Sequence, residues 1–257
     1  MRKIFGAIGA LAIASLLSAS SFGALVETNY STSNPPTANA DTAYDSFILN
    51  NDLVNNGQPT LSSVSITAGS QGFSNAVGAY DGSGGTNSTN AAYFSAFPGS
   101  GSTAALAFTL NTSGADSAGY NISEIQSFAG WNASEEFSDQ TYTIMYTKVG
   151  ETPGSYSHTL TSVNYLPFVG LANGSQSAST RVVLNDSLGG SIATGVSQIE
   201  FVTSQPVNGS QSDAGWQGTV YREFDVVGTA AAVPEPASMG MLLAACGVMA
   251  LRWRRAL

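Results

Sequence analysis

Short stretches of alternating hydrophobic and polar residues recur along the middle of the chain. Leu106, Phe108 and Leu110 are separated by small or polar residues, and the same period of two recurs at 140–146 and 199–201. Successive side chains of an extended strand point to opposite faces, so this alternation predicts antiparallel strands with one buried face. Clusters of Gly, Asn, Ser and Asp lie between the segments, as expected of turns.

The last alternating segment covers residues 221–226 and carries acidic side chains. A strict period of two predicts two faces: Tyr221, Glu223 and Asp225 on one, and Arg222, Phe224 and Val226 on the other. No part of the middle region shows a sustained helical stripe, and the clusters at 81–90 and 208–215 are too glycine-rich for helix interiors. We therefore predict an all-β fold, a single antiparallel β-sandwich (jelly roll) over 45–229, preceded by a polar linker or edge segment at 25–44.

The amino terminus has the layout of a secretory signal. Arg2 and Lys3 precede an apolar run at 4–17, and small residues follow at 18–21. We predict a signal helix within residues 1–24, recognised by the Sec export machinery and cut by signal peptidase close to Gly23 or Ala24.

A second apolar segment, 237–251, lies near the carboxyl terminus. It is about 15 residues long, short of the roughly 20 that a helix needs to cross a hydrocarbon core. Trp253 could act as an interfacial anchor for a marginal span, and the arginines predict a cytoplasmic end. The residues that flank the segment are Val233, Pro234, Glu235 and Pro236 before it and Arg252, Arg254 and Arg255 after it.

This combination of a Val-Pro-Glu-Pro element, a short apolar helix and an arginine-rich end resembles the PEP-CTERM sorting signal of Gram-negative bacteria. The resemblance covers 233–257 and places the sorting and anchor segment at 230–257. It implies handling by an exosortase-like transpeptidase or protease, an inner-membrane-tethered intermediate, and a final location at the cell surface or in the extracellular matrix. A plain single-pass anchor is the alternative.

Charge separates the termini from the middle. Only Lys148, Arg181 and Arg222 of the eight basic residues lie outside the two terminal segments, whereas all 17 acidic residues lie between the apolar runs. An acidic domain cannot neutralise phosphates, so we exclude nucleic acid as a partner. The one cysteine, Cys246, lies in the tail segment, so the exported domain forms no internal disulfide.

Four short motifs are similar to those of galactose-binding-domain-like (discoidin-type) jelly rolls. They are the Ala-Tyr-Asp-Gly turn at 79–82, the strand and tryptophan at 122–131, the Gln-Thr-Tyr-Thr-Ile-Met-Tyr strand at 140–146 and the closing strand at 220–228. The resemblance spans residues 45–228. It implies a jelly-roll scaffold and, in many relatives, carbohydrate recognition and a structural ion.

Signals for catalysis are weak. The one histidine, His158, occurs without a nucleophile elbow, and no metalloprotease or phosphate-loop motif is present. We expect His158 on a strand surface and a protein that is not an enzyme. A secreted glycoside-active enzyme stays open as an alternative, because it would need only two opposed carboxyl groups.

Two kinds of candidate site remain. Exposed aromatic rings stack on sugars, and Trp216 with small neighbours is the best candidate, together with Asp213, Gln217 and Trp131. Hard oxygen ligands suit calcium. The sequence predicts no cofactor apart from structural calcium, for which the candidate ligands are Asp81, Glu135 and Asp139.

Together these patterns predict an exported surface or matrix protein. Its jelly-roll domain would bind glycan or extracellular polysaccharide, or serve as a structural part of the envelope matrix. A self-associating adhesive protein is a further alternative.

Overall fold

The computed structural model describes residues 23–34, 40–67, 73–74, 76–84, 92–96, 103–131, 135–168, 176–204 and 217–233. Within these ranges no helix is long and apolar enough to cross a membrane. The predicted signal helix and the predicted carboxyl-terminal helix lie outside the described residues.

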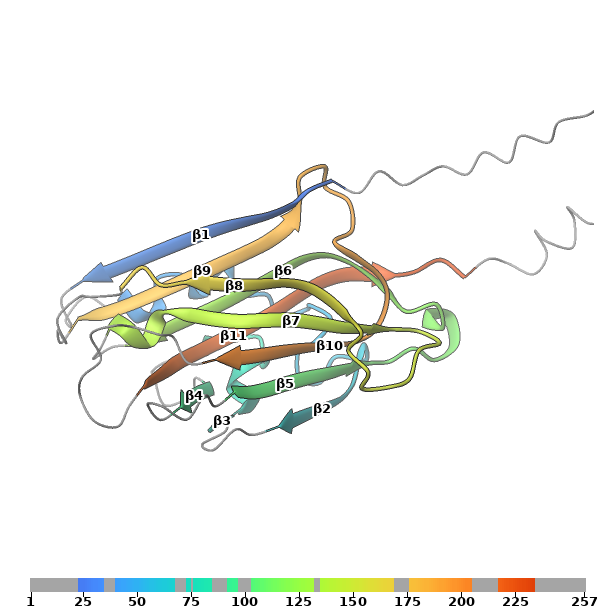
Figure 1. The fold of residues 1–257 in the computed structure, drawn as a ribbon, viewed down its shortest axis with the longest axis horizontal. Coiled ribbons are helices and arrows are strands. Elements are labelled where there is room, and N and C mark those ends of the chain that lie inside the picture. The colour runs from blue at the N-terminus through green and yellow to red at the C-terminus, as the bar shows by residue number, and fades with distance from the viewer. Residues whose placement is uncertain are drawn as a thin grey trace, which may run out of the picture.

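Eleven strands and five short 3-10 helices make up the described chain (Figure 1). The strands are β1 (Leu25–Asn34), β2 (Leu61–Thr67), β3 (Phe73–Ser74), β4 (Ala92–Ala96), β5 (Thr103–Leu110), β6 (Tyr120–Trp131), β7 (Gln140–Lys148), β8 (His158–Tyr165), β9 (Ser177–Asp186), β10 (Ala193–Ser204) and β11 (Gln217–Ala230). The 3-10 helices are η2 (Ala40–Thr42), η3 (Asp45–Phe47), η4 (Ala76–Ala79), η6 (Gly114–Asp116) and η7 (Glu135–Ser138).

All strand pairs are antiparallel, and together they form one sheet that curls into two layers. One layer has the order β2-β5-β10-β7-β8, and the other has the order β3-β4-β11-β6-β9-β1. The layers are joined where the start of β10 pairs with the start of β6, at Ala193↔Ile122 and Val196↔Tyr120. The predicted all-β sandwich is confirmed.

The core lies between the two layers and contains the residues that the alternation predicted to be buried. Leu106, Phe108 and Leu110 of β5 are buried, as are the inward residues of β7 and β10. Aromatic rings from both layers meet at the centre, where the ring centroids of Phe201 and Phe224 are 4.4 Å apart. Burying such rings is the main favourable term for a domain whose described part contains no disulfide.

The strict alternation predicted for the last strand is wrong. A β-bulge between Tyr221 and Glu223 shifts the register of β11 against β6 by one residue. A bulge places one extra residue on one strand, so the sides of the strand exchange beyond it. The core-facing residues are therefore Tyr221, Phe224 and Val226, whereas Arg222, Glu223 and Asp225 belong to the opposite face.

The segment at 25–44 contributes strand β1, which pairs with β9 along the edge of its layer from Leu25↔Asp186 to Asn34↔Ser177. The chain then crosses β6 closely through η2. A Cβ atom on Gly130 would clash with the main-chain oxygen of Asp41 and with Cδ of Arg222. This close approach seats the segment that follows β1 against the outer face of β6 and β11.

Candidate functional site

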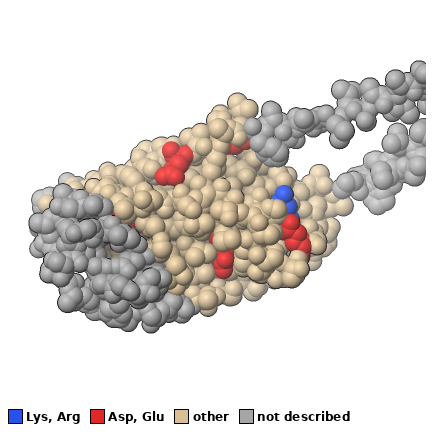
Figure 2. All heavy atoms as spheres, in the orientation of Figure 1, with Lys and Arg blue, Asp and Glu red and all other residues tan. Residues whose placement is uncertain are grey.

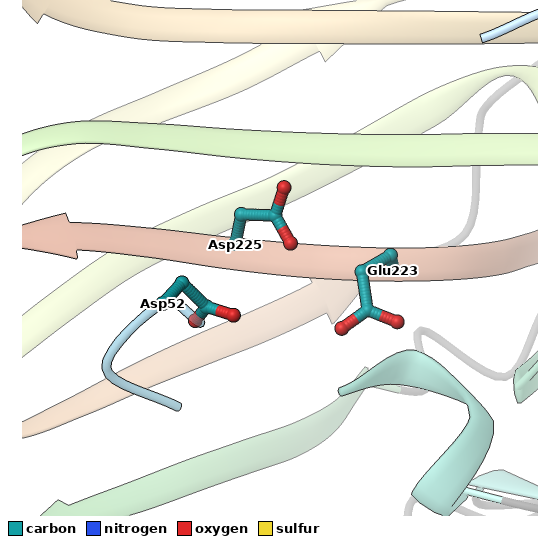
Figure 3. A group of neighbouring side chains, drawn as sticks. All are labelled: Asp52, Glu223 and Asp225. Atoms are coloured by element: carbon teal, nitrogen blue, oxygen red, sulfur yellow. The ribbon is translucent and has the colours of Figure 1, made fainter. Parts of the chain in front are cut away.

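Three carboxyl groups meet beside β11 in a buried cluster, here called the carboxylate cluster. Glu223 and Asp225 come from β11, and Asp52 comes from the segment between η3 and β2 (Figure 3). One carboxylate oxygen from each lies within 4.8 Å of the other two. The exposed fractions of Asp52, Glu223 and Asp225 are 5%, 0% and 0%, so the cluster is closed to solvent.

Main-chain bonds hold Asp52 next to β11. The N–H of Leu53 donates to the carbonyl oxygen of Val226 at 2.9 Å, and the N–H of Val226 donates to Oδ1 of Asp52 at 3.1 Å. Strand β4 pairs only with the first part of β11, residues 217–221. Residues 52–53 therefore continue the edge of β11 beyond the end of β4.

Each carboxyl group of the cluster uses one oxygen to accept main-chain N–H groups. Oδ1 of Asp52 accepts the N–H of Val54 at 2.9 Å, in addition to that of Val226. Oδ2 of Asp225 accepts the N–H of Leu49 at 2.9 Å, and Oε1 of Glu223 accepts the N–H of Gly82 at 3.3 Å. The second oxygens are buried and have no hydrogen-bond partner: Asp52 Oδ2, Glu223 Oε2 and Asp225 Oδ1.

Burial raises the pKa values of all three groups. The pKa of Asp52 rises to about 6 and that of Asp225 to about 8, in the latter case with a further increase from the charge of Asp52. Burial, and then the charge of Asp225, raises the pKa of Glu223 well above its usual value. Two unit charges 4.8 Å apart repel by about 3 to 4 kcal/mol at an effective dielectric constant of about 20, so full ionisation without a cation is costly.

The guanidinium group next to the cluster is directed to other carboxylates. Arg222 is 1% exposed and forms a two-point bond with Asp45, at 3.0 Å from Nε and 2.7 Å from Nη2. Its Nη1 lies 4.0 Å from Oδ2 of Asp41. Arg222 thus fastens η2 and η3 to the outer face of β11.

Of the three predicted metal ligands, the structure describes the side chains of Asp81 and Asp139. Asp81 is exposed, and it lies close enough to Glu223 for its charge to raise the pKa of that group. Asp139 is fully buried and accepts the N–H of Phe168 at 3.1 Å. The main chain of Glu135 is part of η7, and its side chain lies outside the described residues.

Sequence reasoning therefore missed the carboxylate cluster. One signal was present, since two acidic residues in a strand with a buried apolar face, Glu223 and Asp225, are unusual unless they have partners. Asp52 had no such signal, because it lies 174 residues from the strand that it bonds.

The predicted ligand-binding residues belong to one end of the sandwich, as far as they are described. β6 ends at Trp131, which pairs with Ala178 at the start of β9, and β11 begins nearby at Gln217. The ring of Trp131 is half-buried and meets Phe137 edge to face, with centroids 6.0 Å apart. Asp213, Trp216 and the side chain of Gln217 lie outside the described residues.

His158 lies on β8, where its Nε2 is 2.7 Å from Oε1 of Glu151. Its ring stacks on that of Tyr146, with centroids 4.9 Å apart. The side chains of His158 and Glu151 are each one-third exposed. This arrangement fits the predicted strand-surface histidine.

Comparison with protein families identifies the carboxyl-terminal segment. The family model for the PEP-CTERM protein-sorting motif matches residues 232–256. The chain carries a PEP-CTERM protein-sorting motif. The motif begins two residues after β11 ends at Ala230, and Val233, the first residue of its Val-Pro-Glu-Pro element, is 44% exposed. The other predicted sorting residues lie outside the described residues. A PEP-CTERM motif indicates an exported, surface-directed protein.

No curated protein sequence matches the chain. Among solved structures, the X-ray crystal structure of chitosan-binding module 1 from a chitosanase/glucanase of Paenibacillus sp. IK-5 aligns with 69% of this chain and 98% of that chain. The identity is 16% and the TM-score is 0.36, values that assign no ligand to this chain.

Proposed function

We propose that this PEP-CTERM protein is a non-enzymatic surface or matrix protein whose β-sandwich binds extracellular polysaccharide. The observation that carries the proposal is the direct junction between the sandwich and the sorting motif. Only one residue separates Ala230, the last residue of β11, from the start of the motif at 232. The sandwich is therefore the cargo that the motif directs to the surface.

Binding is favoured over catalysis because four acidic groups that the structure buries have no access to a substrate. A glycosidase needs two carboxyl groups on either side of the scissile bond. Asp52, Glu223 and Asp225 are all less than a tenth exposed, and Asp139 is fully buried. A sugar ring cannot reach any of these four groups in the described fold.

The proposed binding region is the end of the sandwich that carries Trp131. An aromatic ring with an approachable face can stack on a sugar, and Phe137 fixes the orientation of the Trp131 ring by its edge-to-face contact. Figure 2 shows a face on which uncharged side chains predominate and charged groups are few, which suits a polymer rich in hydroxyl groups. The similarity of four sequence motifs to discoidin-type jelly rolls agrees with this choice of ligand class.

The proposal is tested by binding to an array of glycans and bacterial exopolysaccharides. The full-length chain, purified in mild detergent, is applied with calcium and with chelator. We expect saturable binding to at least one polysaccharide and its loss in Trp131→Ala and Trp216→Ala. Tyr30→Ala is the matched control, because Tyr30 is an exposed aromatic residue in the middle of β1. If the folded protein binds none of the glycans or exopolysaccharides on the array, polysaccharide binding is refuted.

A self-associating adhesive role is the second candidate. Within the described residues, β2 is the terminal strand of its layer and has five exposed residues, among them Ile66 at 47% exposure. An uncovered strand edge is a template for pairing with another chain. This role predicts concentration-dependent sedimentation that Ser65→Pro on β2 abolishes, whereas sugar binding would be unaffected.

The sorting step has its own test. Replacing Pro234 and Glu235 together by alanine is expected to leave the protein at full length in the inner membrane of its host, because the element that marks the motif is lost. Intact mass and membrane fractionation measure the result. Normal processing and surface delivery of this variant would show that the motif is not used.

A further inference from the structure

We propose that Asp52, Glu223 and Asp225 form a binding site for one divalent cation of the calcium type. The inference goes beyond the proposed function, since polysaccharide binding neither requires it nor implies it. It rests on the geometry of the carboxylate cluster: three oxygens within 4.8 Å of one another, supplied by two separate parts of the chain.

The cluster differs from an ordinary acidic patch in its burial and in its unused oxygens. Asp52 Oδ2, Glu223 Oε2 and Asp225 Oδ1 are buried without a hydrogen-bond partner, although the other oxygen of each group is bonded to the main chain. Buried polar atoms in native proteins are nearly always satisfied. Three neighbouring carboxyl groups that each keep one buried oxygen without a partner therefore indicate a missing positive partner.

The neighbouring arginines are already used. Arg222 makes its two-point bond to Asp45. Arg181 donates from Nε to Oε1 of Gln126 at 2.9 Å, and its guanidinium lies 4.2 Å from the ring centre of Phe47. Arg181 acts on Asp225 through its charge, which lowers the pKa of that group against the larger rise from burial, yet one oxygen of each of the three carboxyl groups still has no hydrogen-bond partner.

The chemistry of the donors selects the cation. Carboxylate oxygens are hard ligands, which favour calcium or magnesium over zinc, whose structural sites use cysteine and histidine. Magnesium gives up its water reluctantly and keeps several water ligands, whereas calcium accepts up to eight protein oxygens at 2.3–2.6 Å. A site whose ligands are at most 5% exposed has little room for retained water, so calcium fits best.

A cation at this position would tie together three parts of the chain. Asp52 belongs to the segment before β2, Glu223 and Asp225 belong to β11, and Glu223 also bonds the turn at Gly82. The three ligands lie close together only in the folded domain. A cation would therefore bind the folded state and not the unfolded chain, and would stabilise the folded domain. Because β11 leads directly into the sorting motif, the site would strengthen the strand to which the tail is attached.

Calorimetric titration of the full-length chain in mild detergent, freed of divalent ions, tests the site. We expect one calcium ion per chain, a calcium-dependent rise in melting temperature and weaker binding of magnesium. Asp52→Asn and Asp225→Asn each remove one ligand charge while keeping the side-chain shape, so affinity should fall by about tenfold or more. Glu27→Gln, which removes an exposed charge on β1, is the control and should bind calcium like the original chain.

The substitutions also relieve repulsion in the ion-free protein, so both variants should fold without calcium, as far-ultraviolet circular dichroism would show. Calcium binding by Asp225→Asn with unchanged affinity would overturn the assignment of ligands. Absence of any bound cation and of any melting shift in the original chain would overturn the site itself. Neither result would affect the polysaccharide assay, whose readout is independent.

Discussion

The main-chain N–H of Val226, in the second half of β11, donates a hydrogen bond to Oδ1 of Asp52. Val226 also accepts the N–H of Leu53, so a loop segment bonds this residue as a neighbouring strand would. The side chain of Val226 is fully buried in the core, whereas Asp225 faces the opposite side of the strand. One strand thus builds the core with one face and the carboxylate cluster with the other.

Arg222 is expected to contribute strongly to stability, because it is the cation on which Asp45 and Asp41 depend. Arg222→Met would leave these carboxylates without it, and breaking a buried pair in this way costs about 3 to 5 kcal/mol. Arg222→Lys should lower the free energy of unfolding by less than this, since lysine keeps the charge but cannot form the two-point bond. Urea unfolding measures both. Lys148→Met, at the end of β7, is the control, and it should change the free energy of unfolding by no more than about 0.5 kcal/mol. A change for Arg222→Met as small as that of the control would contradict the expectation.

Gly130 is expected to tolerate no side chain, because the main chain at Asp41 crosses directly over it. Gly130→Ala would push η2 away from β6 and strain Arg222, and such overpacking costs about 1 to 3 kcal/mol. Thermal unfolding checks the change. Gly190→Ala is a suitable control, since the nearest atom to its Cβ would be the carboxylate oxygen of Asp186 at 3.0 Å, in a loop that can adjust. A Gly130→Ala protein as stable as the control would mean that the crossing is loose.

The sandwich could be predicted from the sequence because alternate residues of its strands face the core. Those positions are apolar, which gives the strands their period of two. Leu106, Phe108 and Leu110 are buried as expected, since every one of them faces the other layer. The bulge at Tyr221 was not predictable in this way. The bulge depends on how β11 pairs with β6. The residue pattern of β11 alone does not mark where one extra residue is inserted and the two faces of the strand change sides.

The carboxylate cluster was beyond sequence reasoning for a different reason. The segment that covers Glu223 and Asp225 comes from residues 49–54, far away along the chain. The sequence indicates metal ligands in turns and loops, such as Asp81 in its glycine-rich turn. The structure instead gathers buried carboxylates, whose proximity arises only from tertiary packing.

The ion-free protein is expected to lose stability as the pH rises. The pKa of Asp52 is raised from 3.8 to about 6 and that of Asp225 from 3.8 to about 8, so the folded state holds protons that the unfolded state has released. The stability from these protonated forms is fully present below pH 3.8 and is lost as the pH passes through about 6 and then about 8. Urea midpoints with chelator between pH 5 and 9 should therefore fall.

The same titration in Asp225→Asn isolates the cause. This variant removes the group with the pKa of about 8, so its midpoint should change less than that of the original chain between pH 7 and 9. Glu27→Gln should keep the original slope, because Glu27 is exposed on β1. A midpoint that rises with pH in the ion-free protein would contradict burial of the cluster.

Ser127 is expected to hold a buried polar network together. Its hydroxyl lies 2.6 Å from Oε1 of Gln140, to which it donates, and 2.7 Å from the hydroxyl of Tyr142. Ser127→Ala leaves two buried polar groups each short of a partner, at a cost of about 1 to 3 kcal/mol. Ser162→Ala is the control, because Ser162 bonds Thr143 on the exposed side of the sheet. Its effect on urea unfolding should be small.

Adding Tyr142→Phe to Ser127→Ala distinguishes two costs: the loss of the hydrogen bond itself, and the burial of a Tyr142 hydroxyl that has lost its partner. The double variant has no tyrosine hydroxyl left to satisfy, so it should be less destabilised than the sum of the two single changes predicts. Strict additivity would mean that Ser127 and Tyr142 act independently. Because this network lies between β6 and β7, in opposite layers of the sandwich, a positive result would also show that polar contacts help to set how the two layers meet.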